Sequence, residues 1–177
     1  MQAEIITFEE GEKSKRLSVV ESLAEKMVEK EFTRKDAIIA LGGGVVGDIA
    51  GFLASIYFRG IPYIQIPTTL LAMVDSSIGG KTGVDMECGK NLIGTTTQPI
   101  AVFIDTNYLK TLPVKQIRNG LAEIIKYGII ADQKLFKFIE QNLNKIFAHE
   151  EKAINYIIKR SVEIKVKIIE EDEKERG

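Results

Sequence analysis

The hydrophobic positions divide the chain into a first part with short apolar runs and a second part with helical periodicity. In the first part, two short apolar runs flank a segment that is apolar on nearly every side. Short continuous runs are typical of strands buried on both faces, and the segment between them predicts a buried helix. The predicted elements are, in order, a strand within residues 1–8, a helix at about 14–30, a strand at 36–41, a helix at 45–57 and a strand at 61–66.

The second part follows a segment with little periodicity. Residues 67–99 are rich in Gly, Thr, Ser and Lys and predict a long functional loop, because they are too apolar for disorder. A short buried strand is expected at 101–105, and beyond Val114 the apolar spacing predicts helices, among them 132–146 and about 150–174. The pattern predicts an α/β fold with a parallel sheet, followed by an all-helical part. The predicted domains are an α/β domain at 1–112 and the start of a helical domain at 113–177.

A glycine-rich turn joins the first long apolar run to the buried helix. Gly42, Gly44 and Gly47 match the spacing G-x-G-x-x-G, and the pattern has a strand before it and a helix after it. A turn without side chains lets a pyrophosphate approach the backbone, where N–H groups at the helix start bind it. The next strand ends in Pro67-Thr68-Thr69, without the acid that holds the ribose in an ordinary Rossmann dehydrogenase.

Several lysines occur in unusual surroundings. Lys81 and Lys90 lie in one Gly-rich loop, which favours a phosphate or carboxylate site over solvated surface lysines. Glu123 and Lys126 share one helix face, and their spacing alone indicates an exposed ion pair. Lys165 falls inside an apolar stripe, so its side chain either reaches back to solvent or points into a polar cavity.

Charge and composition narrow the classes of partner. The net charge is -1, which favours neither nucleic acid nor a membrane surface, and no apolar run approaches the roughly 20 residues of a membrane span. The single cysteine, Cys88, excludes an internal disulfide and fits a reducing cytoplasm. The single histidine, His149, is expected at the surface without a second ligand nearby, so histidines cannot assemble a metal site here.

Seven blocks of the sequence resemble 3-dehydroquinate synthase in their order and spacing, and the resemblance extends from about Glu10 to the last residue. The blocks are residues 10–15 (EGEKSK), 42–48 (GGGVVGD), 67–71 (PTTLL), 74–83 (VDSSIGGKTG), 89–94 (GKNLIG), 110–113 (KTLP) and 120–128 (GLAEIIKYG).

The resemblance implies a lyase of the shikimate pathway, which serves aromatic amino acid biosynthesis. The family converts 3-deoxy-D-arabino-heptulosonate 7-phosphate to 3-dehydroquinate and phosphate. NAD accepts and later returns a hydride, and a divalent metal, usually zinc, polarises the oxygen that is oxidised. The resemblance also implies a cytoplasmic homodimer that binds a small sugar phosphate.

The resemblance assigns expected roles to individual residues. Four residues match substrate-binding positions, namely Lys81, Lys90, Asn91 and Lys126. Asp75 matches a residue at the boundary between cofactor and substrate, and Lys165 matches a buried active-site lysine. Arg59 matches an arginine that reaches the substrate phosphate of a neighbouring subunit, and Glu123 matches a metal-ligating carboxylate. The expected NAD contacts are Glu10, Gly11, Glu12, Lys13, Ser14, Lys15, Gly42, Gly43, Gly44, Val45, Val46, Gly47, Asp48, Thr68, Thr69, Lys81, Lys90, Tyr108, Leu109, Lys110 and Thr111.

The resemblance also implies that the family chain is longer at both ends. Two metal-ligating histidines lie beyond the position of Gly177, so we expect an internal piece with both domains incomplete, inactive on its own. Two other classes stay open. One is a metal-dependent dehydrogenase of the glycerol dehydrogenase type, although it lacks the lysine-containing blocks. The other is a non-catalytic nucleotide-binding or dimerisation module, or a fragment produced by truncation or proteolysis.

Overall fold

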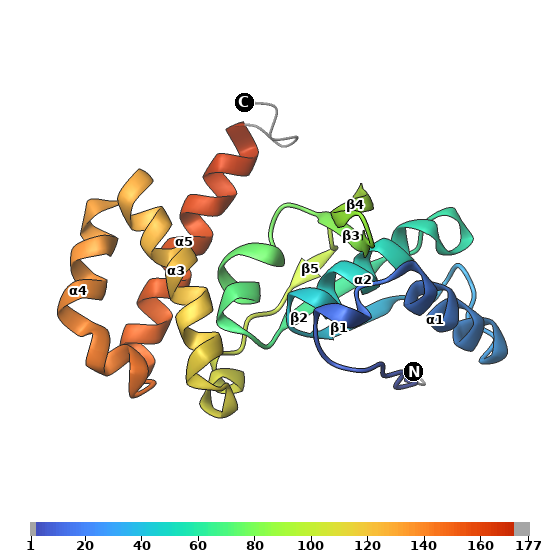
Figure 1. Cartoon of the computed structure of the whole chain (residues 1–177), viewed down its shortest axis with the longest axis horizontal. Helices are drawn as coiled ribbons and strands as arrows, with labels where there is room; N and C mark the ends of the chain where they lie inside the picture. The colour runs from blue at the N-terminus through green and yellow to red at the C-terminus, as the bar shows by residue number, and fades with distance from the viewer. Residues whose placement is uncertain (1–2, 172–177) are drawn as a thin grey trace.

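The computed structural model describes residues 3–171, which form an α/β half and a helical half that lie side by side (Figure 1). Three parallel strands make the sheet in the order β1-β2-β5. The fold class predicted from the sequence, a parallel sheet followed by helices, is therefore confirmed. The α/β half contains α1 (Leu17–Glu29), β1 (Ile38–Gly42), α2 (Gly44–Ile56), β2 (Tyr63–Pro67) and β5 (Ala101–Val102).

The unit β1–α2–β2 lies within about two residues of the predicted bounds. The register pairs Ile38 with Tyr63 and Gly42 with Pro67, so both strands end at the same edge of the sheet. Buried side chains of α2 pack with α1 against one face of the sheet. On β1, Ile39 and Leu41 alternate with buried Ala40 and are exposed on the opposite face.

The predicted N-terminal strand is wrong for the residues that the structure describes. Residues 3–10 have no strand partner, and Ile6 and Phe8 instead pack, partly buried, against the core between α1 and α2. Residues 1 and 2, which also belong to that prediction, lie outside the described residues. A short 3-10 turn, η1 (Glu12–Ser14), precedes α1, so the predicted helix begins three residues later than expected at Leu17.

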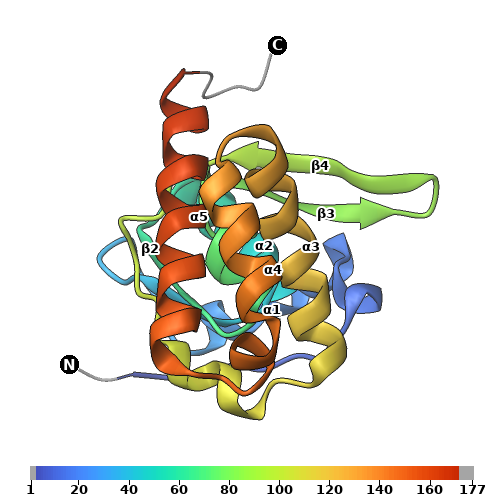
Figure 2. The ribbon, with the colours of Figure 1, turned by 90° about the vertical axis from the view of Figure 1, so that its left-hand side faces the viewer.

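The prediction of a long loop at 67–99 is also wrong, because most of these residues form regular secondary structure. A π-helical turn, η3 (Ala72–Ser76), is followed by the antiparallel strands β3 (Lys81–Met86) and β4 (Gly89–Thr96). Gly83 pairs with Gly94, and a Cβ atom on Gly83 would lie 2.5 Å from the carbonyl oxygen of Ile93. The two glycines therefore let the strands approach closely, and the hairpin projects from the body of the molecule (Figure 2).

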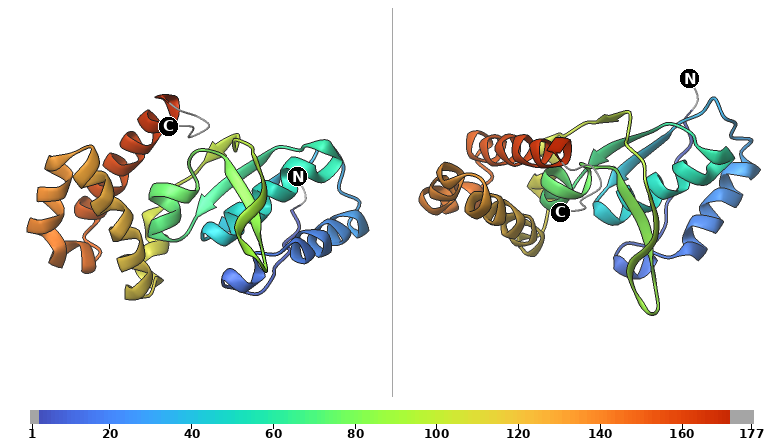
Figure 3. Two further views of the ribbon diagram at one scale, coloured as in Figure 1. Left: turned by 45° about the horizontal axis from the view of Figure 1, so that its top comes forward. Right: turned by 90° about the horizontal axis from the view of Figure 1, so that it is seen from above.

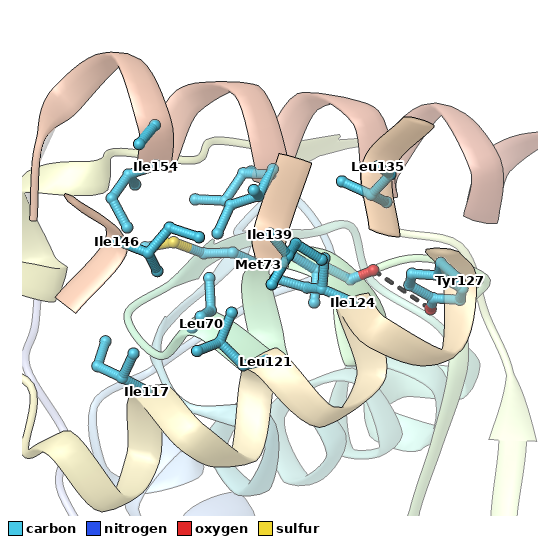
Figure 4. Packing of buried hydrophobic residues seen from close by; sticks show 14 of the residues in the cluster. Leu70, Met73, Ile117, Leu121, Ile124, Tyr127, Leu135, Ile139, Ile146 and Ile154 are labelled. Carbon is cyan, nitrogen blue, oxygen red and sulfur yellow. Dashed lines mark hydrogen bonds between the residues drawn. The ribbon is translucent and has the colours of Figure 1, made fainter. Parts of the chain in front are cut away.

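The helical half consists of α3 (Val114–Ile130), α4 (Gln133–Phe147) and α5 (Glu151–Glu171), entered through the 3-10 turn η4 (Thr106–Thr111). The predicted helices are confirmed over the described residues, and residues 172–174 of the last one lie outside them. The predicted strand at 101–105 is limited to two residues. The side chains of Leu70 and Met73, next to and within η3, enter the helical core beside Leu121 and Ile124 (Figure 4).

The hairpin, η3 and the end of α5 thus lie where the two halves meet, as further views show (Figure 3). Within residues 3–171, none of the helices combines the length and apolarity that crossing a membrane requires.

Candidate functional site

The glycine turn lies between β1 and α2, as predicted. Its backbone is held by the N–H of Thr68, which donates to the carbonyl of Gly42 at 2.8 Å. The first N–H groups of a helix have no acceptor within the helix, so those of Gly44 and Val45 are placed to bind an anion. A Cβ atom on Gly44 would lie 2.9 Å from the Oγ atom of Ser76, so the turn packs directly against η3. The turn fits the approach of a pyrophosphate to the backbone.

Asp48, near the start of α2, forms an ion pair with Lys15. Lys15 is buried, and its ammonium group also donates to Oδ1 of Asn91 at 2.5 Å. Burial raises the pKa of the Asp48 carboxyl, and the hydrogen bond from Lys15 opposes that rise. Lys15 therefore connects the glycine-turn helix to strand β4, although the sequence places these three residues far apart.

The segment at residues 12–15 is joined to the hairpin by further contacts. The ammonium group of Lys90 donates to Glu12 at 2.8 Å, and the N–H of Asp85 donates to the carbonyl of Lys15 at 2.8 Å. The Oδ1 atom of the buried Asp85 accepts from the N–H of Asn91, also at 2.8 Å. The structure thus brings the two predicted cofactor segments, residues 10–15 and 42–48, together at the turn end of the hairpin.

A cleft of about 500 Å³ lies beside this network, where the two halves of the molecule meet. Its lining includes Asp48, Asp75, Lys81, Asn91 and Lys165, all of which were predicted as site residues. These five residues come from α2, η3, β3, β4 and α5 in turn.

Lys165 points into the polar cleft. Its ammonium group lies 3.0 Å from Oδ1 of Asp75, and its side chain is 18% exposed. Of the two orientations expected from the sequence, the side chain therefore adopts the one that points into a polar cavity, and it does not reach back to open solvent.

Other predicted site residues do not line the cleft. The ammonium group of Lys126 lies 2.5 Å from Oε1 of Glu123, so the ion pair expected from their spacing is present. Lys90 is exposed and bonded to Glu12, as described above. Arg59 is exposed just beyond the C-terminal end of α2, with a positive φ of 69°. In η4, Leu109 is buried in the helical core, while Tyr108 is partly exposed.

The described side chains do not by themselves fit a catalytic metal site. Within residues 3–171, no group of three or more His, Cys, Asp or Glu side chains is arranged to hold a metal ion. Glu123, the predicted ligand, is bonded to Lys126. His149, which was predicted as an exposed surface residue, is partly buried and follows the C-terminal end of α4 with a positive φ of 54°. We therefore derive no chemical step through a metal.

Two residues at this site were missed in the sequence. Tyr127 donates to Oδ1 of Asp75 at 2.8 Å, and Asp85 accepts from the backbone of Asn91. Tyr127 belongs to the apolar stripe of α3, so its pattern indicated only core packing. Asp85 lies in the segment that was predicted as a loop, where no pairing partner could be assigned. The hairpin register would have been needed to find it.

Comparison with known sequences then decides the family. Residues 5–119 match the N-terminal domain of 3-dehydroquinate synthase, and residues 120–177 match its C-terminal domain. The chain belongs to the 3-dehydroquinate synthase family. A 3-dehydroquinate synthase of Alkaliphilus metalliredigens is 55% identical over 174 residues, which are 98% of this chain and 49% of that protein. One of Dictyoglomus thermophilum is 52% identical over 174 residues, with the same two coverages.

The chain thus spans about half the length of the curated relatives that it matches. Among solved structures, it resembles 2-epi-5-epi-valiolone synthase of Streptomyces hygroscopicus subsp. jinggangensis with NAD+ and Zn2+ bound. The TM-score is 0.92 at 33% identity, over 96% of this chain and 48% of that one. A 2-deoxy-scyllo-inosose synthase, complexed with carbaglucose-6-phosphate, NAD+ and Co2+, gives 0.91 at 36% identity, over 98% and 48%.

The dehydrogenase alternative is related through the fold alone. An iron-containing alcohol dehydrogenase of Thermotoga maritima has a TM-score of 0.67 at 18% identity, over 92% of this chain and 52% of that one. The likeness to the cyclases is stronger in both structure and sequence.

Proposed function

We propose that this chain carries the NAD site and much of the substrate site of a 3-dehydroquinate synthase. The reaction is the conversion of 3-deoxy-D-arabino-heptulosonate 7-phosphate to 3-dehydroquinate and phosphate. The observation that carries the proposal is the cleft, which places Lys81, Asn91 and Lys165 beside the glycine-turn helix in a chain of this family. This combination suits a phosphorylated, hydroxyl-rich substrate held next to a dinucleotide.

The glycine turn is the proposed pyrophosphate site. NAD+ supplies a hydride acceptor when it is bound, and the chain supplies the backbone N–H groups of α2 and the contacts of residues 10–15. Thr68 and Thr69 follow β2 at the same edge of the sheet, and a Cβ atom on Gly43 would lie 3.0 Å from the methyl group of Thr69. These hydroxyls stand where an ordinary Rossmann domain has its strand-end acid. Residues 108–111 remain proposed cofactor contacts.

The cleft residues have distinct proposed roles toward the sugar phosphate. The ammonium groups of Lys81 and Lys165 offset the charge of the anionic substrate, and Asn91 offers an amide to its hydroxyl groups. Asp75 accepts a hydrogen bond from a hydroxyl at the boundary between cofactor and substrate. Lys90 and Lys126 would join them after leaving their ion pairs with Glu12 and Glu123.

A divalent metal, the second subunit and the compartment complete the proposal. The two cyclase structures named above contain Zn2+ or Co2+, and Glu123 is the carboxylate that we propose as a zinc ligand. Arg59 is exposed and free to extend toward a partner subunit in a homodimer. Light scattering of the protein tests whether it is a dimer. If Arg59 contacts the substrate of the neighbouring subunit, Arg59→Ala is expected to lower activity while the mass of the dimer stays the same. We also propose that the enzyme works in the cytoplasm.

Two measurements test the function. The protein is expressed from its complete reading frame, and phosphate release from the heptulosonate phosphate is followed with NAD+ and zinc, beside a calorimetric titration of NAD+. We expect phosphate release that Lys165→Met reduces at least about a hundredfold. Lys159→Met is the matched control, because Lys159 is an exposed lysine on the same helix. Lasting accumulation of NADH from a simple alcohol, without phosphate release, would instead establish the dehydrogenase alternative.

A further inference from the structure

Three segments of the chain meet at one oxygen atom of Asp75. The hydroxyl of Tyr127 in α3 donates to Oδ1 at 2.8 Å, and the ammonium group of Lys165 in α5 lies 3.0 Å from the same atom. Asp75 itself lies in η3, the π-helical turn that follows β2. Both donors therefore come from the helical half, and both act on a carboxylate carried by the segment beside the glycine turn.

Tyr127 has the properties of a fixed donor. It is 2% exposed, and its ring packs among Ile124 and Leu135 in the helical core (Figure 4). Its oxygen also lies 3.4 Å from the carbonyl oxygen of Val74. Burial and the negative charge of Asp75 raise the pKa of the phenol far above its usual value of 10.0. The geometry places the hydroxyl to donate toward η3.

Two donors on Oδ1 determine how Asp75 presents its second oxygen. A carboxylate held at one oxygen by a buried hydroxyl and an ammonium group loses its freedom to rotate. Asp75 and Lys165 line the cleft, whereas Tyr127 does not. The next residue, Ser76, is the one that packs against Gly44 of the cofactor turn. A change in the position of η3 would therefore alter the cofactor side and the substrate side of the cleft together.

We propose that Tyr127 is a positioning residue, which fixes Asp75 between the NAD and sugar-phosphate sites and, through Asp75, aims Lys165 into the cleft. This inference rests on the proposed function and adds to it a residue that touches neither ligand. The tyrosine joins the helical half to the cofactor half through a single hydroxyl.

The test removes that hydroxyl and keeps the ring. Tyr127→Phe and Tyr63→Phe are compared in the protein expressed from its complete reading frame. Tyr63 is the matched control, because it is 1% exposed and donates to the carbonyl of Thr97 at 2.8 Å, outside the cleft. We expect Tyr127→Phe to weaken NAD+ binding and to lower kcat by about tenfold each, and Tyr63→Phe to change either by less than threefold.

A double-mutant cycle separates positioning from a general structural role. In an Asp75→Ala background the hydroxyl has lost the carboxylate that it is proposed to position, so adding Tyr127→Phe is expected to cause no further loss of NAD+ affinity or kcat. An equal further loss in that background would overturn the proposal. So would a Tyr127→Phe protein that does not fold while Tyr63→Phe does, or one that binds and turns over like the parent. A parent protein without NAD+ binding or phosphate release would instead refute the proposed function itself.

Discussion

The ammonium group of Lys15 and the carboxylate of Asp48 form an ion pair that is almost withdrawn from solvent. Their side chains are 7% and 19% exposed, whereas the pair of Lys30 with Glu4 is 41% and 34% exposed. A buried lysine with both a carboxylate and the amide oxygen of Asn91 as acceptors is well compensated as long as the partners remain. Loss of the Lys15 ammonium group would leave the Asp48 carboxylate in surroundings where burial disfavours its negative charge.

The first prediction concerns that pair. Lys15→Met is expected to lower the free energy of unfolding by about 3 kcal/mol, because it leaves a buried carboxylate without its partner. The matched change Lys30→Met removes an exposed pair and is expected to cost less than about 1 kcal/mol. Urea denaturation followed by circular dichroism measures both. Equal losses would show that burial of Lys15 has no energetic consequence.

The second prediction concerns Asp132, which caps α4. Its side chain accepts from the N–H groups of Lys134 and Leu135 at 2.9 and 3.3 Å and is bonded to Arg160. We expect Asp132→Ala to lower the free energy of unfolding by about 2 kcal/mol at pH 7. Asp105→Ala, at the exposed N-terminus of η4, is the control and should cost less.

The same cap predicts a dependence on acid. The hydrogen bond from Arg160 is the main reason that the pKa of Asp132 lies below its usual value. A carboxyl whose pKa is lower in the folded state than in the unfolded state stabilises the fold at pH values above its unfolded pKa of about 3.9. This stabilisation is lost as the pH falls through the pKa of the folded state. The difference between parent and Asp132→Ala should therefore be constant from pH 5 to 7 and shrink below about pH 3.9. A difference that grows in acid would contradict this assignment.

The sequence predicted some elements well because their physical cause is local. The β1–α2–β2 unit follows from continuous apolar runs interrupted by glycines, and Lys165 stood out because a charge interrupted an apolar stripe. The β3–β4 hairpin had no such signal. Its strands are held by backbone contact at Gly83 and Gly94, and glycines carry no alternation of hydrophobic and polar side chains.

The prediction of an N-terminal strand was wrong for a different reason. Ile5, Ile6 and Phe8 have suitable residue types, but a strand also needs a neighbour, and pairing cannot be read from one segment alone. The contact between Tyr127 and Asp75 was likewise invisible, since it joins residues 52 positions apart. Long-range contacts of this kind decide the geometry of the cleft.

The third prediction concerns how the free energy of unfolding changes with pH in alkaline solution. Burial and Asp75 raise the pKa of Tyr127 in the folded protein, while an unfolded tyrosine ionises near pH 10. Above about pH 10 the unfolded chain loses this proton and the folded chain keeps it, so stability falls as the pH rises. Tyr127→Phe should flatten that fall in denaturation curves between pH 9 and 11. Tyr156→Phe, which changes a more exposed ring, is the control.

The fourth prediction tests the glycine turn. Gly44→Ala is expected to weaken NAD+ binding at least about tenfold in a calorimetric titration, because a methyl group would hinder the approach of the phosphates. The new methyl would also meet Ser76, so the change is repeated in a Ser76→Ala background, with Ser76→Ala alone as control. If the double variant bound NAD+ as tightly as Ser76→Ala alone, collision with Ser76 would explain the whole effect and the turn would not be the pyrophosphate site.

The last prediction ranks the lysines of the proposed anion site. Lys81 lines the cleft, whereas Lys90 and Lys126 are bonded to Glu12 and Glu123 with side chains 70% and 58% exposed. Lys90 and Lys126 lie outside the cleft and would have to leave these ion pairs to reach a phosphate bound in it.

Inorganic phosphate, a product of the reaction, serves as the probe. Its inhibition constant is measured in an assay that detects 3-dehydroquinate rather than phosphate. Lys81→Met should weaken inhibition by about tenfold, the loss of one hydrogen bond between charged groups, and Lys90→Met and Lys126→Met by less than about threefold each. Equal and large losses at all three would mean that the hairpin and α3 turn their lysines into the cleft when ligand binds. An unchanged inhibition constant in Lys81→Met would remove this lysine from the anion site.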